Sequence, residues 1–140
     1  MKKVALALML ITAVTGCKQN SRKAEINIAQ VMADTTVVNV LYFRIKKRCE
    51  TCTAVAAIAK KTVEAAYADN SNVRYIEIDN SEKSNEPLLE KYDVAWNALI
   101  IAKGDNAVDI TQRAFLYAVK NPQMVEDRIK NEVDKRLIRN

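Results

Sequence analysis

Apolar and polar positions along the chain follow two periodicities. Three segments predict strands because they are dense in β-branched and aromatic residues or alternate between apolar and polar side chains: 36–45, 73–79 and 98–102. The first and third are nearly continuous apolar runs, which is typical of strands buried on both faces. A turn at 103–106 leads to a fourth strand, 107–111, which should pair with the third as a hairpin.

Helical spacing of apolar residues predicts four helices between and after these strands. The longest inner one covers 53–68, where one apolar stripe recurs every three or four residues. Shorter helices are expected at 85–91 and 112–120. A last helix should begin at Pro122, with Asn121 as its cap.

The order of elements is therefore strand, helix, strand, helix, strand, strand, helix, with an extra helix at the C-terminal end. A strand–helix–strand opening implies parallel pairing through a right-handed crossover, and the hairpin adds an antiparallel edge. This combination predicts an α/β, thioredoxin-like fold with a central mixed sheet of about four strands. The 140 residues suffice for one such domain, which we expect at 36–140.

The N-terminal residues follow a different pattern. Two lysines precede a largely apolar run at 4–14, which is shorter than the roughly 20 residues that span a bilayer and is typical of a secretory signal. Residues 14–17, Val-Thr-Gly-Cys, resemble the lipobox of bacterial lipoproteins, in which the cysteine is lipidated and becomes the first residue after cleavage. We therefore expect a signal peptide at 1–16 and lipidation of Cys17. The alternative is an ordinary leader that happens to contain a cysteine.

Residues 17–35 begin polar and without a clear period, so we interpret them as a lipidated tether. Within this segment Ile26, Ile28, Val31 and Met32 could form a short ordered piece. Acyl chains on Cys17 would hold the domain at the inner or outer membrane of a bacterial cell envelope, facing the periplasm. In that oxidising space a pair of thiols can form a disulfide.

Composition narrows the function classes. The chain has no histidine, which excludes mechanisms that need an imidazole base. Its net charge of +5 would fall to +3 once Lys2 and Lys3 leave with the signal peptide, and so small a charge does not favour nucleic-acid binding. The sequence has no Gly-rich phosphate loop or other flavin fingerprint, and we expect no bound cofactor.

Candidate chemistry concentrates in Cys49 and Cys52, at the junction of the first strand and the first long helix. A helix N-terminus offers a partial positive charge and unpaired N–H groups, and both stabilise a thiolate. Lys47 and Arg48 add positive charge, whereas Glu50 opposes it. We therefore predict a lowered pKa for Cys49, with thiolate present at neutral pH.

The spacing of two residues puts the sulfurs within disulfide reach. Cys49 would attack a partner's disulfide, and the more buried Cys52 would resolve the mixed disulfide. Three alternatives stay open. A structural disulfide would close only a small loop. A zinc site lacks further Cys or His ligands unless two chains share it. The two thiolates could instead bind a soft metal or metalloid such as Cu(I), Hg(II) or arsenite.

Two neighbouring features are candidate supporting residues. Lys47 and Arg48 belong to a basic run whose alternative role is a solvated loop, although its charge acts on Cys49 in either case. Trp96 comes just before the third strand, near the expected position of a thioredoxin substrate groove. The alternative for Trp96 is a packing role.

Residues 38–43, Arg48-Cys49-x-Thr51-Cys52 and Tyr92-x-Val94-Ala95-Trp96 resemble the nitrophenyl compound nitroreductase subunit (ArsF-type) family, whose members are thioredoxin-like lipoproteins or exported proteins. The resemblance covers 37 to about 138. It implies a thioredoxin-like fold with a Cys-x-x-Cys pair, and the family name does not establish a nitroreductase reaction.

The chain departs from ordinary thioredoxins at the proline that they place before the third core strand, in a cis bond facing the cysteines. Asn97-Ala98 stands there in this sequence. We expect a trans bond, because a cis bond without proline costs roughly 3 kcal/mol. That proline keeps metals away in the family, so its absence favours the metal-binding alternative.

Together these features predict a lipid-anchored thiol–disulfide oxidoreductase or electron-relay protein that acts through Cys49 and Cys52 on the thiols or disulfides of another protein. The alternative is a module that binds a soft metal or metalloid through the same two thiolates without disulfide turnover.

Replacing Cys17 by Ser tests the lipid anchor. Serine has no thiol for the thioether bond, so we expect Cys17→Ser to move from the membrane fraction to the soluble fraction, measured by cell fractionation and immunoblotting. Cys52→Ser is the matched control and should stay with the membranes. A Cys17→Ser protein that remains membrane-bound contradicts the anchor.

Overall fold

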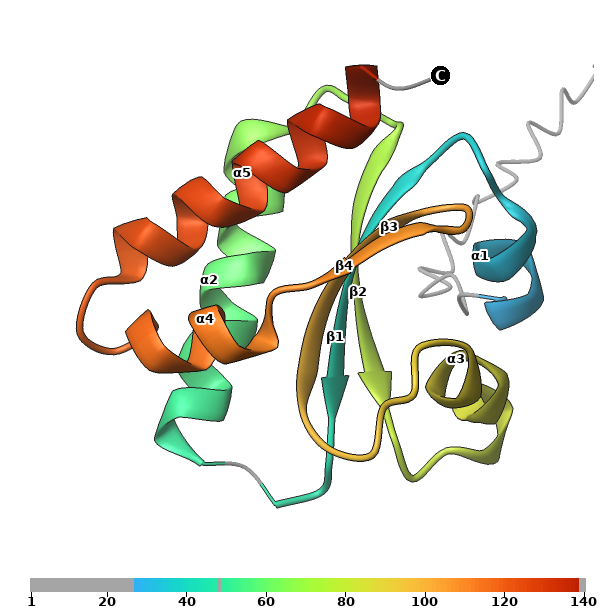
Figure 1. The fold of residues 1–140 in the computed structure, drawn as a ribbon, viewed down its shortest axis with the longest axis horizontal. Helices are drawn as coiled ribbons and strands as arrows, with labels where there is room; N and C mark the ends of the chain where they lie inside the picture. The colour runs from blue at the N-terminus through green and yellow to red at the C-terminus, as the bar shows by residue number, and fades with distance from the viewer. Residues whose placement is uncertain (1–26, 48, 139–140) are drawn as a thin grey trace, which may run out of the picture.

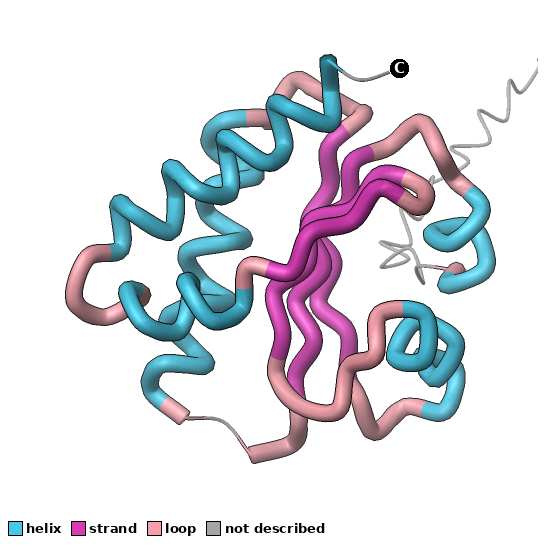
Figure 2. Tube along the Cα trace, viewed as in Figure 1, coloured by secondary structure: helices cyan, strands magenta, loops and turns pink. Residues whose placement is uncertain are grey.

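The computed structural model describes residues 27–47 and 49–138. These residues form a four-stranded sheet with helices on both faces (Figures 1 and 2). The strands are β1 (Val38–Arg44), β2 (Val73–Asp79), β3 (Ala98–Lys103) and β4 (Asn106–Asp109). The helices on one face are α2 (Glu50–Ala66), α4 (Thr111–Tyr117) and α5 (Pro122–Ile138). The other face carries α1 (Ile28–Ala33), the 3₁₀ turn η1 (Lys83–Asn85) and α3 (Glu86–Lys91).

The strand order is β2-β1-β3-β4. β1 pairs with β2 in parallel through the α2 crossover and with β3 in antiparallel, and β3 and β4 form the expected hairpin. Gly104 lies in the hairpin turn at a φ of 57°, in the left-handed region that a two-residue loop opening on glycine uses. This topology and the C-terminal helix confirm the thioredoxin-like α/β fold.

β1 is buried on both faces, and this explains its continuous apolar run. Val38, Val40 and Tyr42 pack against α2, α4 and α5, whereas Leu41 and Phe43 pack on the side of α1 and α3. Each of these side chains is at most 2% exposed. The helices on both faces therefore pack against β1, and a short loop leads from its end at Arg44 to the start of α2 at Glu50.

The N-terminal boundary of the domain differs from expectation. The tether was expected to extend to residue 35, but α1 occupies Ile28–Ala33, and Val31 is 5% exposed in the same apolar cluster as Leu41 and Ile76. Residues 27–35 therefore belong with the folded domain, and the short ordered piece is a helix. The leader, Cys17 and the rest of the tether lie outside the described residues.

Other element ends shift by only a few residues. α2 begins at Glu50 rather than at residue 53, and α4 ends at Tyr117 rather than at residue 120. β4 covers Asn106–Asp109 rather than 107–111. Among the helices of the described residues, none has the length and apolarity to cross a membrane.

The packing of α5 on the sheet can be tested with two isoleucines of that helix. Ile129 is 0% exposed and Ile138 is 82% exposed. Ile129→Ala leaves a cavity, so we expect it to lower the free energy of unfolding by about 2–5 kcal/mol in urea titrations. Ile138→Ala removes an exposed side chain and should change it by less than about 0.5 kcal/mol. Equal effects of the two substitutions would contradict this packing.

Candidate redox site

The candidate site lies where β1 ends and α2 begins. Cys49 is the N-cap of α2, with extended backbone, and its Sγ accepts the backbone N–H of Cys52 at 3.1 Å. The Cys49 carbonyl accepts the backbone N–H and the hydroxyl of Thr53, at 3.0 and 3.1 Å. The sulfur thus takes one of the N–H groups that a helix start leaves without a backbone partner.

The two cysteines form a disulfide, with an S–S distance of 2.13 Å and Cα atoms 5.0 Å apart. This confirms that the spacing brings the two sulfurs together in the first turn of the helix. Cys49 is exposed, whereas Cys52 is only 6% exposed. A partner can therefore approach the bond from the side of Cys49, and the expectation that the second cysteine is the more buried one is confirmed.

Two side chains of β1, those of Tyr42 and Arg44, lie next to Cys52. The Tyr42 hydroxyl is buried and donates to the Cys52 carbonyl at 2.9 Å, which ties the first turn of α2 to the central strand. Arg44, at the end of β1, forms ion pairs with Glu77 at 2.8 Å and Asp79 at 2.7 Å, both on β2. The positive charge of Arg44 is thus largely compensated on the sheet. No sequence pattern indicated the role of Tyr42, because its hydroxyl contacts a residue ten positions away.

The segment between α3 and β3 also contacts the site, through Asn97. α3 is followed by Asp93 at a φ of 51°, a left-handed residue after which the chain turns toward β3. Further on, the Trp96 carbonyl accepts the Asn80 amide at 2.9 Å. Asn97 Oδ1 accepts the Ile45 N–H at 3.0 Å, and Asn97 Nδ2 donates to Cys52 Sγ at 3.5 Å. One amide side chain thus joins the loop after β1 to the buried sulfur.

The candidate supporting residues have different surroundings. Lys47 is exposed in the bend before α2, and Arg48 lies outside the described residues. Trp96 is 72% exposed, so the packing role is wrong for this residue. The peptide bonds of the described residues are all trans, which confirms the expectation for Asn97-Ala98.

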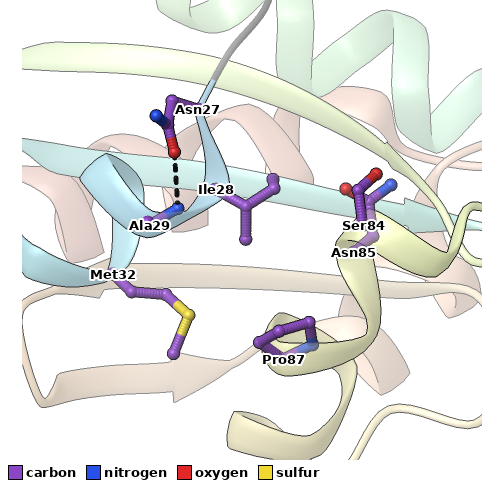
Figure 3. Close-up of a pocket in the computed structure, with 7 residues that line it drawn as sticks. All are labelled: Asn27, Ile28, Ala29, Met32, Ser84, Asn85 and Pro87. Carbon is purple, nitrogen blue, oxygen red and sulfur yellow. Dashed lines mark hydrogen bonds between the residues drawn. The ribbon is translucent and has the colours of Figure 1, made fainter.

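A cavity beside Cys52 has a volume of only about 10 Å³, with Tyr42, Arg44 and Asn97 among its walls. It holds at most one water molecule. A larger hollow, of about 700 Å³, lies on the other face of the sheet between α1 and the η1–α3 segment (Figure 3). Its lining, which includes Met32 and Pro87, contains no cysteine and no ionisable side chain. Neither hollow offers a small-molecule substrate an enclosed position against the disulfide.

In the described part of the chain, no group of three or more Cys, His, Asp or Glu side chains could hold a metal ion. This finding concerns a zinc site with several protein ligands, whereas the soft-metal alternative uses only the two thiolates. The two sulfurs are bonded to each other, and they must be reduced before they can act as thiolate ligands.

No model of a known protein family matches this chain, and no curated protein sequence matches it. The resemblance to the nitroreductase-subunit family therefore stays a prediction.

Proposed function

We propose that this chain is a thiol–disulfide oxidoreductase or electron-relay protein of the bacterial envelope that exchanges disulfides with another protein. The observation that carries the proposal is the asymmetry of the disulfide at the start of α2. Cys49 is exposed and caps the helix, and Cys52 is 6% exposed. A purely structural disulfide gains nothing from an exposed sulfur at a helix N-terminus, whereas an exchange reaction needs one that can be attacked.

In one direction, the exchange oxidises a dithiol of the partner. A partner thiolate attacks Cys49 Sγ, the Cys49–Cys52 bond breaks, and Cys52 leaves with the electron pair and takes up a proton. The second partner thiolate then attacks the partner sulfur of the mixed disulfide and releases Cys49 as a thiolate. Two electrons pass from the partner to the cysteine pair, and the reverse sequence reduces a partner disulfide.

Three local features support a Cys49 thiolate after reduction. The first turn of α2 presents its partial positive charge to the sulfur, and the Cys52 N–H already points at Cys49 Sγ at 3.1 Å. Lys47 lies close in sequence and is exposed. Glu50 is the opposing charge, in the first turn of the helix. The balance favours the thiolate, in line with the lowered pKa predicted for Cys49.

A protein suits this site better than a small molecule as the partner. The cavity beside Cys52 holds at most a water molecule, and the attacked sulfur lies at the surface. Trp96 is 72% exposed and directly precedes Asn97, so its side chain offers a partner protein an apolar contact. The proposed lipid on Cys17 would keep the domain at the membrane, where exported partners are found.

Soft-metal or metalloid binding is the second candidate function. It is favoured by Asn97-Ala98, where thioredoxins have the proline that keeps metals away. This function needs the reduced pair and predicts stoichiometric binding of Cu(I), Hg(II) or arsenite without disulfide turnover.

Trapping with Cys52→Ala distinguishes the two functions. Without the resolving thiol, a mixed disulfide at Cys49 should accumulate several-fold over the wild-type protein. It is detected on non-reducing gels of whole cells and identified by mass spectrometry after release with a thiol reductant. Cys49→Ser is the control and should capture nothing. A Cys52→Ala protein that captures no partner, while the reduced wild-type protein binds Cu(I) tightly, would reverse the assignment.

A further inference from the structure

Cys52 has to carry a negative charge in surroundings that disfavour it. In the proposed exchange it leaves as a thiolate when a partner attacks Cys49, and it attacks as a thiolate when it resolves a mixed disulfide. Its side chain is 6% exposed, and burial raises the free energy of a thiolate relative to a thiol. The reaction therefore needs a group that stabilises the charged sulfur.

The groups around Cys52 leave few candidates. The Tyr42 hydroxyl donates to the Cys52 carbonyl, and the Arg44 guanidinium is paired with Glu77 and Asp79. On α2 itself the Cys52 N–H points to Cys49 Sγ. The walls of the small cavity contain no carboxylate, and the Thr53 hydroxyl among them donates to the Cys49 carbonyl at 3.1 Å. Asn97 remains, since its amide donates to Cys52 Sγ at 3.5 Å.

The orientation of the Asn97 amide is fixed by a second contact. The Ile45 N–H is a donor, so the atom that faces it at 3.0 Å must be Oδ1. This leaves Nδ2, with its two N–H groups, on the side of the sulfur. The Ile45 N–H in the loop after β1 thus orients the Asn97 amide so that its NH₂ group faces the Cys52 sulfur.

We propose that Asn97 is the hydrogen-bond donor that stabilises the Cys52 thiolate during disulfide exchange. The inference rests on the proposed function, which it deepens. A disulfide sulfur is a weak acceptor, whereas a thiolate is a strong one, so the bond strengthens when Cys52 becomes charged. Asn97 thereby favours the departure of Cys52 when a partner attacks Cys49.

The same bond assists the reverse step. Cys52 gives its proton to solvent, and its thiolate attacks Cys49 Sγ in the mixed disulfide. The Cys49–Cys52 bond forms, the bond from Cys49 to the partner breaks, and the partner thiolate leaves with the electron pair. Lowering the pKa of Cys52 raises the fraction of attacking thiolate at neutral pH, so Asn97 shifts the pH profile of resolution downward.

The direct test titrates Cys52 as the one remaining thiol, in a background that carries both Cys17→Ser and Cys49→Ser, by the ultraviolet absorbance of the thiolate. Asn97→Ala removes the donor, so the pKa of Cys52 should rise by about one unit, which corresponds to about a tenfold lower thiolate fraction. Asn97→Asp keeps an acceptor for the Ile45 N–H but puts a carboxylate beside the sulfur, and it should raise the pKa at least as far.

Asn80→Ala is the matched control. Asn80 holds the neighbouring Trp96 carbonyl at 2.9 Å and so fixes the same loop, but its amide donates there rather than to Cys52. Its titration should match that of the parent. In proteins that keep Cys49, Asn97→Ala should also slow the resolution of a mixed disulfide with a small aromatic thiol about three- to fourfold near neutral pH, because the smaller thiolate fraction is partly offset by a more nucleophilic thiolate, and the effect should vanish at high pH.

Two results would overturn the inference: an unchanged pKa of Cys52 in both Asn97 variants, or an equal rise in Asn80→Ala, which would make loop placement the cause. These results are separate from failure of the proposed function. Cys52 titrates in the background that carries Cys17→Ser and Cys49→Ser whether or not the wild-type protein exchanges disulfides. A wild-type protein that captures no partner would therefore refute the function alone.

Discussion

The hydrogen bond from the Cys52 N–H to Cys49 Sγ, at 3.1 Å, defines both the first turn of α2 and the chemistry of the site. The bond exists because a helix start has N–H groups without backbone partners, and here a sulfur caps the helix where Ser, Thr, Asp or Asn is usual. In the proposed exchange this cap is also the nucleophile, so the local structure of the helix start would control its reactivity. The N–H groups at the N-terminus of the helix are also the groups that favour a thiolate at that position.

The sheet gives this helix start a rigid base. β1 is buried on both faces, and the Tyr42 hydroxyl at its C-terminal end ties down the Cys52 carbonyl. Because β3 runs antiparallel to β1, with Phe43 paired to Ala98, the chain enters β3 at this same end of the sheet. Asn97 therefore meets Cys52 although 45 residues separate them in sequence. The thioredoxin-like topology thus assembles the site from the end of one strand and the start of another.

How far each part could be predicted from sequence depends on whether its cause is local. The pattern predicts β2 at its observed bounds, Val73–Asp79, because apolar and polar side chains alternate along most of it. The start of α2 was placed three residues late, because the pattern of apolar residues does not register a capping sulfur. α1 lies in the segment interpreted as a tether, where apolar residues indicate only a short ordered piece, because a helix of six residues carries too little periodicity to be predicted as a helix. Its contact with the sheet shows that it belongs to the domain. The amide of Asn97 and the hydroxyl of Tyr42 act across the fold, so no local pattern could identify them.

The proposed function depends on the Cys49 sulfur being charged at neutral pH once the disulfide is reduced, because this sulfur caps α2. A pH titration of the Cys49 thiolate in a reduced protein that carries both Cys17→Ser and Cys52→Ala tests this most directly, with the ultraviolet absorbance of the thiolate as the readout. The account predicts a midpoint clearly below the value of about 8.5 for an ordinary cysteine thiol. A midpoint at or above that value would contradict this prediction, since the N-terminus of the helix would then not stabilise the thiolate, and little of it would be present at neutral pH.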